Sequence, residues 1–526
     1  MPDADTDRGR TVLTRHVVPL QGPEGSGPVG RGLDVPGALF ALRGRRGLAA
    51  LDSAGGEPRR WSIVAFDPFR PLTFTRDDGR GLDDVDRALA SVTFEGEEPP
   101  GPFGGGFVGA LGYELGVRDE RLDLPPPAWP QPVLAGGLYG DWIALRHAPD
   151  GRVADAHLVL SSGPGLAPVA ERSQAVLDDL ARAASVPGPP PAPPPGPHPG
   201  PSAIDSGPAR RHVEPAEHRA RIERVRGFIG EGEVYQANLA HRMTATVEAD
   251  ALQVYAALRA SNPAPYMGFL DVDLPDGGRG AIVSSSPELL VEVGADAHGR
   301  RVARTRPIKG TAGRGATPAE DAARRAALLA SEKDRAELAM IVDLERNDLG
   351  RVAVPGGVEV DGFPTLESYA SVHHLVADVR AVLRDDVRAL DVLASLFPGG
   401  SITGAPKLRS MEVIAELERE GRGFFTGTLG FAGADGRAAF NILIRTLLHR
   451  TRADGEREVS FHVGGGITWG SDPEDEDDET MLKAAGMLAA LRSAEATRPG
   501  GAPGSSPGPS PGPSPGPSSR VLPGVR

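Results

Sequence analysis

Hydrophobic residues in the first third of the chain stand in short runs that are bounded by Gly, Pro or Asp. Runs of six or seven residues occupy 12–18, 47–52, 61–67 and 133–139. Runs of this length between turn residues predict β-strands. The glycine-dense segment 103–116 lacks the strand, GxGxxG motif and helix of a dinucleotide-binding loop, so a tight turn between strands is the better interpretation.

Helical and strand periods alternate irregularly beyond residue 210. Apolar residues recur with helical spacing at 214–231, 317–347, 391–396, 408–419 and 474–491. Short apolar runs that predict strands lie at 281–284, 289–293, 424–432, 438–449 and 459–463. No βαβ unit repeats, so the pattern predicts an α+β fold and not a doubly wound parallel sheet.

Two segments of the chain are too rich in Pro to form a core. Of the 51 prolines, ten lie in 187–201 and nine in 494–526. Such compositions are typical of stiff, extended linkers, and less often of ligands for proline-recognition domains. The sequence therefore predicts an N-terminal region at 1–185, a linker at 186–210, a main domain at 211–493 and a disordered tail at 494–526.

The overall composition excludes several classes of protein. The chain has no Cys, which excludes disulfides and thiolate chemistry, and its net charge of −14 argues against a nucleic-acid partner. It has no run of about 18 apolar residues, so no membrane partner is expected. The first twenty residues are polar and acidic, unlike a signal peptide, and the expected location is the cytoplasm.

Two pairs of acidic residues stand three apart in predicted helices, so each pair shares one helix face. They are Asp334 with Glu337, and Glu476 with Glu479. Four carboxylates on two helices could hold a hard divalent cation such as Mg²⁺, which prefers oxygen ligands. The alternative is a solvated helix start, because 474–479 is a run of six acids. Even with a metal site, Glu474, Asp475 and Asp477 are expected to face solvent.

Lys309 and Glu288 are candidates for a chemical step. Lys309 stands between Pro307 and Gly310 in the segment TRPIKGT, where a desolvated lysine would be a nucleophile. An exposed lysine in a turn is the alternative. Glu288 precedes an apolar strand, where burial would keep it protonated as a general acid, although a capping carboxylate fits equally well.

Three other features are compatible with the binding of a small anion. Arg445 lies in a run with the pattern of a core strand, where a guanidinium needs an anionic partner such as a carboxylate. Gly464, Gly465 and Gly466 follow a predicted strand, and their amides could cradle a carboxylate. His374 could act in acid–base chemistry or could be a half-buried strand histidine.

Eight segments of the second part carry a family resemblance when they are taken together and in order. They are GEVYQANLAHR (232–242), SSSPELLVEV (284–293), TRPIKGT (305–311), KDRAELAMIVDLERNDLGRV (333–352), VHHLVADV (372–379), FPGGSITGAPKLRSMEVI (397–414), FNILIRT (440–446) and GGGITWGSDPEDEDDETMLKA (464–484). The chain resembles the chorismate-utilising enzymes, and within them component I of the aminodeoxychorismate synthases. This resemblance implies an α+β sandwich of two large antiparallel sheets with helices outside, to which the N-terminal region adds strands.

The resemblance also implies roles for single residues. The implied direct ligands of Mg²⁺ are Glu337 and Glu479, with Asp334 and Glu476 in support. The implied substrate-binding groups are Arg445, the amides of Gly465 and Gly466, and, beside the pocket, Thr403 and Lys407. His374 matches the family's active-site histidine. Phe425 stands where the family commonly has tyrosine, so carboxylate binding is expected to depend more strongly on Arg445.

Two positions distinguish the reactions within this family. Enzymes that add water to chorismate have a lysine where this chain has Gln236, and anthranilate synthases have an alanine where it has Lys309. The resemblance therefore implies that Lys309 attacks ring carbon 2, that Glu288 protonates the departing hydroxyl, and that ammonia adds to give 4-amino-4-deoxychorismate. The alternatives are anthranilate synthase component I and a non-catalytic homologue that binds chorismate or a protein.

The lack of Cys bears on the source of nitrogen. Class I glutaminases release ammonia with a Cys nucleophile, which this chain does not contain. A separate glutaminase subunit (component II) or free ammonia is therefore expected to supply the nitrogen. The product would pass to a downstream aminodeoxychorismate lyase, on a route to p-aminobenzoate and folate or to a secondary metabolite.

Overall fold

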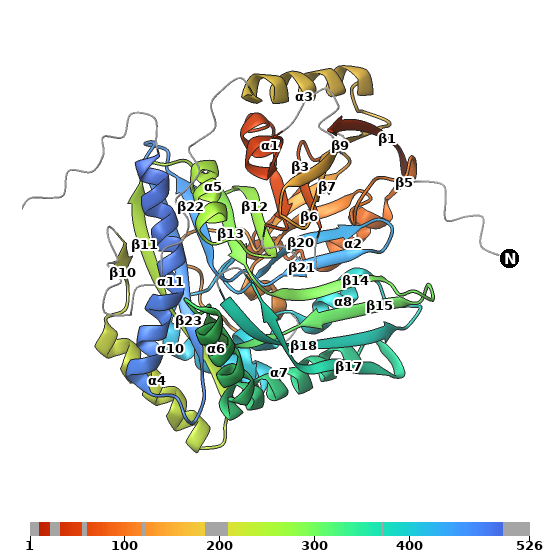
Figure 1. Ribbon diagram of the computed structural model, residues 1–526. Coiled ribbons are helices and arrows are strands. Elements are labelled where there is room, and N and C mark those ends of the chain that lie inside the picture. Colours follow the sequence, from red (N-terminus) through yellow and green to blue (C-terminus); the bar gives the residue numbers. More distant parts are fainter. Residues whose placement is uncertain are drawn as a thin grey trace, which may run out of the picture.

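The computed structural model describes residues 10–21, 32–54, 60–117, 122–184, 209–369 and 372–497. Two large sheets pack face to face within these ranges, and helices cover their outer faces (Figure 1). The predicted linker and tail lie almost wholly outside the described residues.

The larger sheet has 13 strands. Its order is β10 (Arg210–Arg211), β11 (Gln236–Val247), β23 (Arg457–Ile467), β22 (Thr446–Thr451), β13 (Arg279–Ser286), β12 (Tyr266–Asp273), β2 (Ala49–Asp52), β3 (Trp61–Ala65), β8 (Trp142–His147), β9 (Val153–Ser162), β1 (Thr11–Gln21) and β5 (Val92–Gly96), and β19 (Gly404–Ala405) pairs with β11. Strand β1 pairs with β5 in parallel, and the other described pairs are antiparallel.

The smaller sheet has ten strands, all in antiparallel pairs among the described residues. Its order is β16 (Ile308–Gly313), β18 (Val372–Leu383), β15 (Arg301–Arg306), β14 (Leu289–Ala295), β21 (Ala438–Asn441), β20 (Thr428–Gly433), β6 (Gly106–Leu111), β7 (Leu134–Tyr139) and β4 (Arg70–Phe74), and β17 (Ala353–Ser368) pairs with β18. Strand β6 pairs with β20, as β2 pairs with β12 in the larger sheet. Both sheets therefore combine strands from before and after the linker.

Helices form the two outer layers. They are α1 (Val35–Ala41), α2 (Leu82–Ala90), α3 (Val169–Ala184), α4 (Pro215–Gly230), α5 (Ala251–Ser261), α6 (Pro318–Ala330), α7 (Glu332–Gly350), α8 (Ala389–Leu396), α9 (Gly400–Thr403), α10 (Lys407–Glu418) and α11 (Pro473–Ala496), with 3₁₀ turns η1 (Arg76–Asp78) and η2 (Tyr113–Val117). In Figure 1, α5 and α11 lie beside the larger sheet and α7 lies along β17 and β18. No helix in the described ranges is long and apolar enough to cross a bilayer.

Buried apolar side chains form four clusters in the described residues, and one of them joins α4 and α10 to β11. Leu488 of α11 packs with Phe461 of β23 in the layer outside the larger sheet. Trp142 belongs to the layer between the sheets. Leu338 of α7 and Leu375 of β18 belong to the layer outside the smaller sheet. These side chains are buried because apolar residues alternate along the strands and recur with helical periodicity along the helices. The predicted α+β class with two large, mostly antiparallel sheets is confirmed.

The structure differs from the predicted elements where a local interaction interrupts a long pattern. The predicted helix 317–347 is two helices, because the Ser331 side chain accepts a hydrogen bond from the Asp334 amide and starts α7 anew. The predicted strand 438–449 is two strands, β21 and β22. Two amphipathic helices in the N-terminal region, α2 and α3, were not predicted.

A buried ion pair joins three elements near one end of the larger sheet. Arg422 is 2% exposed, and its guanidinium donates to both carboxylate oxygens of Glu418, with N–O distances of 2.9 and 2.6 Å. The same guanidinium donates to the carbonyl oxygens of Ile402 and Asn238, and Glu418 accepts from the Ala240 amide. This pair therefore holds β11, α9 and α10 together.

Glu418→Ala is expected to lower the free energy of unfolding by about 3–5 kcal/mol, because it leaves the Arg422 charge buried without its partner. Urea unfolding monitored by circular dichroism measures this loss. Arg346→Ala removes one member of an exposed pair with Asp343 on α7 and is the control, with an expected change within about 0.5 kcal/mol. Equal losses in the two variants would contradict a structural role for the buried pair.

Candidate active site

Lys309 of β16 lies at the centre of the candidate site. Its Nζ is 3.4 Å from the carbonyl oxygen of Ser401. Burial lowers the pKa of Lys309, and the nearby carboxylates of Glu337, Glu288 and Glu479 oppose that shift. A lysine whose pKa is lowered by burial is more often neutral, and therefore more nucleophilic, than an exposed one.

Glu288 lies within electrostatic range of both Lys309 and Arg445. Glu288 is 5% exposed, burial raises its pKa, and its Oε1 has no hydrogen-bond partner in the described part of the chain. A carboxyl in this state suits a general acid.

The sequence pattern predicts that Arg445 lies inside a core strand, but this prediction is wrong. Arg445 stands in the turn between β21 and β22 with φ of 51°, a left-handed conformation that is strained for a residue other than Gly. The residue is half-buried, and the loss of water around its guanidinium lowers its pKa. The guanidinium forms no hydrogen bond or ion pair with the residues that the structure describes. A half-buried guanidinium without a partner suits an anionic ligand.

Gln236, the first residue of β11, is fully buried, and neither its Oε1 nor its Nε2 has a hydrogen-bond partner among the described residues. The Gln236 side chain can occupy this position because Gly466 of β23 has no side chain. A Cβ there would lie 2.2 Å from Gln236 Nε2 and 3.5 Å from Lys309 Nζ. Gly466 thus brings the backbone of β23 against both side chains, and a larger residue would displace Gln236.

The sequence predicts that Gly464, Gly465 and Gly466 follow a strand, whereas in the structure all three glycines lie within β23. Residues 462–467 of β23 pair with β11 on one edge, whereas the pairing with β22 stops at Phe461. Amides on the other edge of this stretch therefore have no strand beside them. Gly465 faces the opposite side from Gly466, where a Cβ would lie 3.2 Å from Glu476 Oε2.

The four predicted metal-binding carboxylates lie on α7 and α11, near Lys309. Glu337 is within electrostatic range of Asp334 and Glu476, and Glu479 is within range of Lys309. Burial raises the pKa of Glu337, whereas Lys483, with Nζ 2.7 Å from a Glu479 oxygen, lowers the pKa of Glu479. Asp334 packs against β16 because Gly310 has no side chain, and a Cβ there would lie 2.9 Å from Asp334 Cγ.

This carboxylate group fits a hard divalent cation. The Glu337 Oε1 atom is buried without a hydrogen-bond partner in the described ranges, which is costly for an acceptor unless a ligand satisfies it. Glu476 Oε1 is oriented by a hydrogen bond from Ser471 Oγ at 2.6 Å. Oxygen donors with one oriented and one unsatisfied carboxylate match the preferences of Mg²⁺.

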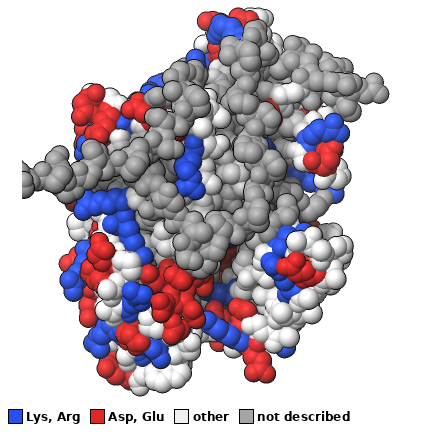
Figure 2. Space-filling view, turned by 60° about the vertical axis from the view of Figure 1, so that its left-hand side comes forward, with Lys and Arg blue, Asp and Glu red and all other residues white. Residues whose placement is uncertain are grey.

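The acidic run that begins α11 is only partly solvated. Asp472, Glu474, Asp475, Asp478 and Glu479 are exposed, and Figure 2 shows acidic and basic side chains interspersed on this face. Asp477, expected to face solvent with Glu474 and Asp475, is 6% exposed. Helical periodicity turns Asp477 towards α4, so the run cannot be solvated along its whole length.

Asp477 belongs to a second group of possible metal ligands, with His218 and His241. Their ligand atoms lie within 4.8 Å of one another. Asp477 is ion-paired with Arg211, and its Oδ1 is 2.7 Å from His218 Nδ1. Since the carboxylate already has two partners, this group anchors α11 to α4 and β10, and we assign no ion to it.

His374 lies on β18 opposite Thr311 of β16, and its Nδ1 is 2.8 Å from Thr311 Oγ1. The side chain is 3% exposed. Burial, together with the charge of Arg445, lowers its pKa to about 4, so it is neutral at pH 7. A neutral imidazole in this place can accept or donate a hydrogen bond without adding charge.

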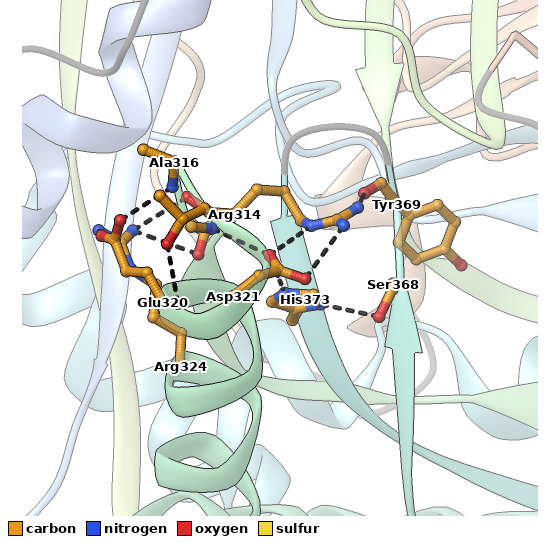
Figure 3. A network of polar contacts seen from close by, with 11 residues as sticks. Arg314, Ala316, Glu320, Asp321, Arg324, Ser368, Tyr369 and His373 are labelled. Atoms are coloured by element: carbon orange, nitrogen blue, oxygen red, sulfur yellow. Dashed lines mark hydrogen bonds and ion pairs between the residues drawn. The ribbon is translucent and has the colours of Figure 1, made fainter.

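The neighbouring His373 holds the strand that carries His374. His373 Nε2 is 2.9 Å from Asp321 Oδ1, and its Nδ1 is 2.8 Å from Ser368 Oγ (Figure 3). Arg314 donates from Nε to the same Asp321 oxygen at 2.7 Å. The network joins α6 to β17 and β18, so the position of His374 is supported from outside the site.

Thr403 and Lys407 lie next to the site, but their side chains have protein partners. Lys407 Nζ is 2.7 Å from Asp348 Oδ2 and donates to the Leu396 carbonyl oxygen. Thr403 Oγ1 donates to the Gly399 carbonyl oxygen at 2.9 Å. Their substrate contacts stay a prediction. Lys407 joins α10 to α7 and α8, and the Thr403 hydrogen bond lies within the turn of α9, which lies beside Lys309.

Glu345 is a buried acid that the sequence patterns did not single out. It is 2% exposed, and it accepts a hydrogen bond from Thr305 Oγ1 at 2.9 Å. Burial and the charge of Glu288 raise its pKa to about 8, so it is protonated at pH 7. Glu345 stands eight residues after Glu337, which is about two turns further along the same face of α7. This spacing was the sequence feature that could have indicated it.

A family model described as chorismate binding enzyme matches residues 50–489 of this chain. The chain belongs to the chorismate-binding enzymes. Homologues within this family divide between aminodeoxychorismate synthases and anthranilate synthase component I. The buried groups around Lys309 lie within the matched range.

Two curated relatives and one solved structure illustrate the similarity. The chain is 37% identical over 477 residues to an aminodeoxychorismate synthase of Streptomyces pristinaespiralis, covering 90% of this chain and 59% of that protein's length. It is 40% identical over 400 residues to anthranilate synthase component 1 of Streptomyces coelicolor, covering 75% and 74%. The crystal structure of anthranilate synthase component I from Streptococcus pneumoniae superposes with a TM-score of 0.66 at 27% identity, covering 82% and 92%.

Glu345→Gln is expected to change how stability depends on pH. The folded protein holds the Glu345 proton up to about pH 8, whereas the ordinary carboxyl pKa is 4.5, so the wild-type free energy of unfolding should fall between these values as pH rises. The free energy of unfolding of the Glu345→Gln variant should fall less over the same pH range. Urea midpoints at pH 5 and pH 7.5 measure the difference, and the exposed Glu416→Gln is the control. A wild-type pH dependence retained by Glu345→Gln would contradict the shift.

Proposed function

We propose that this chain is component I of an aminodeoxychorismate synthase, which aminates chorismate with ammonia to 4-amino-4-deoxychorismate. The observation that carries the proposal is the half-buried Lys309, with its lowered pKa, between a protonatable Glu288 and the carboxylates of α7 and α11. A lysine so placed can attack a ring carbon while an acid beside it protonates a leaving group.

The proposed chemistry takes two displacement steps. Lys309 Nζ forms a bond to ring carbon 2, both conjugated ring double bonds shift by one position, and the carbon 4 hydroxyl leaves as water with the Glu288 proton. Ammonia then bonds to carbon 4, both double bonds shift back, and the carbon 2–Nζ bond breaks. The proton lost by nitrogen in these steps returns to Glu288, so chorismate and ammonia become product and water.

Binding groups for the substrate surround these two residues. Arg445, with no protein partner in the described ranges, supplies a guanidinium for the enolpyruvyl carboxylate, and the free amide edge of β23 supplies hydrogen-bond donors. Phe425 stacks on His462 with ring centroids 4.8 Å apart and offers no hydroxyl. Carboxylate binding therefore depends on Arg445 and on the amides at Gly465 and Gly466.

Glu337 and Glu479, supported by Asp334 and Glu476, would hold Mg²⁺. When bound, the ion would neutralise these carboxylates and withdraw electron density from the ring carboxylate of the substrate. Without such a cation, the protein carboxylates would repel the dianionic substrate. Removal of Mg²⁺ with a chelator is therefore expected to abolish turnover.

Gln236 supports ammonia, and not water, as the nucleophile. Its buried amide oxygen has no hydrogen-bond partner in the described part of the chain and can accept from ammonia, whereas a neutral amide is a poor base for activating water. Because the chain contains no Cys, a separate glutaminase subunit or free ammonium would supply the nitrogen.

The alternative function is that of anthranilate synthase component I, because relatives of both kinds are similar to this chain at comparable identity. The two functions differ in the product that is formed. With purified protein, Mg²⁺, chorismate and an ammonium salt, we expect no anthranilate fluorescence. Addition of an aminodeoxychorismate lyase should then release p-aminobenzoate, measured by chromatography. Direct formation of anthranilate would overturn the assignment, and chorismate binding without turnover would favour a non-catalytic homologue.

Lys309→Ala is expected to lower kcat by a factor on the order of 10³ or more, because it removes the nucleophile of the first step. Calorimetry should show that this variant still binds chorismate. Glu288→Gln keeps the shape but cannot donate the same proton, and a loss of about 10²–10⁴-fold is expected. Unchanged turnover in Lys309→Ala would remove the covalent step.

A further inference from the structure

The carbonyl oxygen of Ser401 is an acceptor for two side chains that come from different sheets. It accepts a hydrogen bond from Asn238 Nδ2 of β11 at 3.2 Å, and it lies 3.4 Å from Lys309 Nζ of β16. A carbonyl oxygen has two lone pairs and can serve both donors. Ser401 is 4% exposed and belongs to α9, a single turn whose carbonyl groups need partners from outside the helix. The larger and the smaller sheet are therefore connected at this one buried oxygen.

Asn238 lies on the face of β11 that is turned towards the candidate active site. Residues two apart in a strand share a face, so its side chain points to the same side as that of Gln236. Asn238 is half-buried and pairs with Gly466 of β23 in the register of the two strands. Gly466 is the residue at which a Cβ would lie 2.2 Å from Gln236 Nε2 and 3.5 Å from Lys309 Nζ. Asn238 thus stands beside the lysine, on the strand that carries Gln236.

Direct contacts hold Lys309 Nζ only weakly. The Ser401 oxygen is its one hydrogen-bond acceptor among the described residues, and 3.4 Å is long for such a bond. Attack on a ring carbon needs the nucleophile placed accurately, with the reacting atoms about 3–3.5 Å apart. The group that orients the Ser401 carbonyl therefore has a strong influence on where Nζ stands. Asn238 is such a group, because its amide donates to the same oxygen at the shorter distance.

We propose that Asn238 is a positioning residue for Lys309, whose amide holds the Ser401 carbonyl so that Nζ is placed without being tightly bound. This contact brings the two sheets into register where the reaction needs it. Lys309 stands on the smaller sheet, whereas Gln236, which we propose as the acceptor for ammonia, stands on the larger one. The inference rests on the proposed role of Lys309 as nucleophile, and Asn238 itself is assigned no contact with a reacting atom.

Removal of the Asn238 amide should make Lys309 less reactive. Asn238→Leu has a similar volume but no donor, so the Ser401 oxygen is left to Lys309 alone. Nζ should then be bound more closely to that oxygen and further from the ring carbon. Asn238→Asp keeps the shape of the side chain, but its carboxylate cannot donate to the carbonyl and attracts the lysine. The loss of reactivity should therefore be larger in Asn238→Asp, and packing cannot account for it.

Competitive acetylation measures this reactivity for each lysine, because the chain has only four: Lys309, Lys333, Lys407 and Lys483. The full chain at pH 8 without Mg²⁺ is treated with a limiting amount of isotope-labelled acetic anhydride, and the products are resolved by mass spectrometry. The exposed Lys333 is the reference. The ratio of Lys309 to Lys333 should fall about threefold or more in Asn238→Leu and about tenfold or more in Asn238→Asp.

Lys407 reports whether the substitution only loosens the fold. Its Nζ is bonded to Asp348 and to the Leu396 carbonyl oxygen, so its acetylation rises if α10 moves. We expect the ratio of Lys407 to Lys333 to stay unchanged. Gln174→Leu removes an exposed amide that is bonded to Asp178 on α3, and this control should change none of the ratios.

Turnover gives a second readout. In Asn238→Leu, kcat should fall about 10–100-fold, whereas KM for chorismate should change less than about threefold, because the carboxylate-binding groups are intact. An unchanged Lys309 ratio in both variants, an equal change at Lys407, or an unchanged kcat would each overturn the inference. A wild type that forms no aminodeoxychorismate would instead contradict the proposed function, and the acetylation ratios would still decide whether Asn238 positions Lys309.

Discussion

The cost of burying charge governs the arrangement around Lys309. An ammonium taken out of water is destabilising unless carboxylates stand near it, and Glu337, Glu288 and Glu479 provide them from three different elements. The same burial raises the pKa of Glu288 and Glu337. Positive and negative groups therefore hold one another in states that none would have in water, and the elements that carry them must be placed accurately.

Backbone geometry provides that accuracy. Gly466 lets β23 approach Gln236 and Lys309, and Gly310 lets β16 approach Asp334. The left-handed Arg445 aims a guanidinium inwards at the point where β21 would otherwise continue into β22. Around this centre, the buried Glu418–Arg422 pair and the His373–Asp321 network hold the walls with contacts that do not face the site. Reactive groups and supporting groups are thus distinct sets of residues.

The sequence predicted the elements that carry regular apolar periods, such as α4, α10 and α11, and the α+β class that follows from their irregular order. It also supplied Lys309, Glu288, Gln236 and the acidic pairs, because the resemblance lies in contiguous segments. It could not show that Arg445 interrupts a strand, since that turn depends on partners such as Ser285, whose amide donates to the Arg445 carbonyl oxygen. It also could not show that Asp477 is buried, because His218 and Arg211 meet it only in the folded chain.

Each sheet joins one block of N-terminal strands to one block of strands from beyond the linker, and this has a consequence for how the protein must be made. Strand β2 acquires its neighbour β12, and β6 its neighbour β20, only after the ribosome has synthesised the intervening segments. Until then the N-terminal strands present unpaired edges, which are prone to join other chains. Pairings between distant parts of a sequence also form slowly. Expression at low temperature, or with chaperones that shield strand edges, should therefore raise the yield of folded protein more than it would for a chain whose halves fold separately.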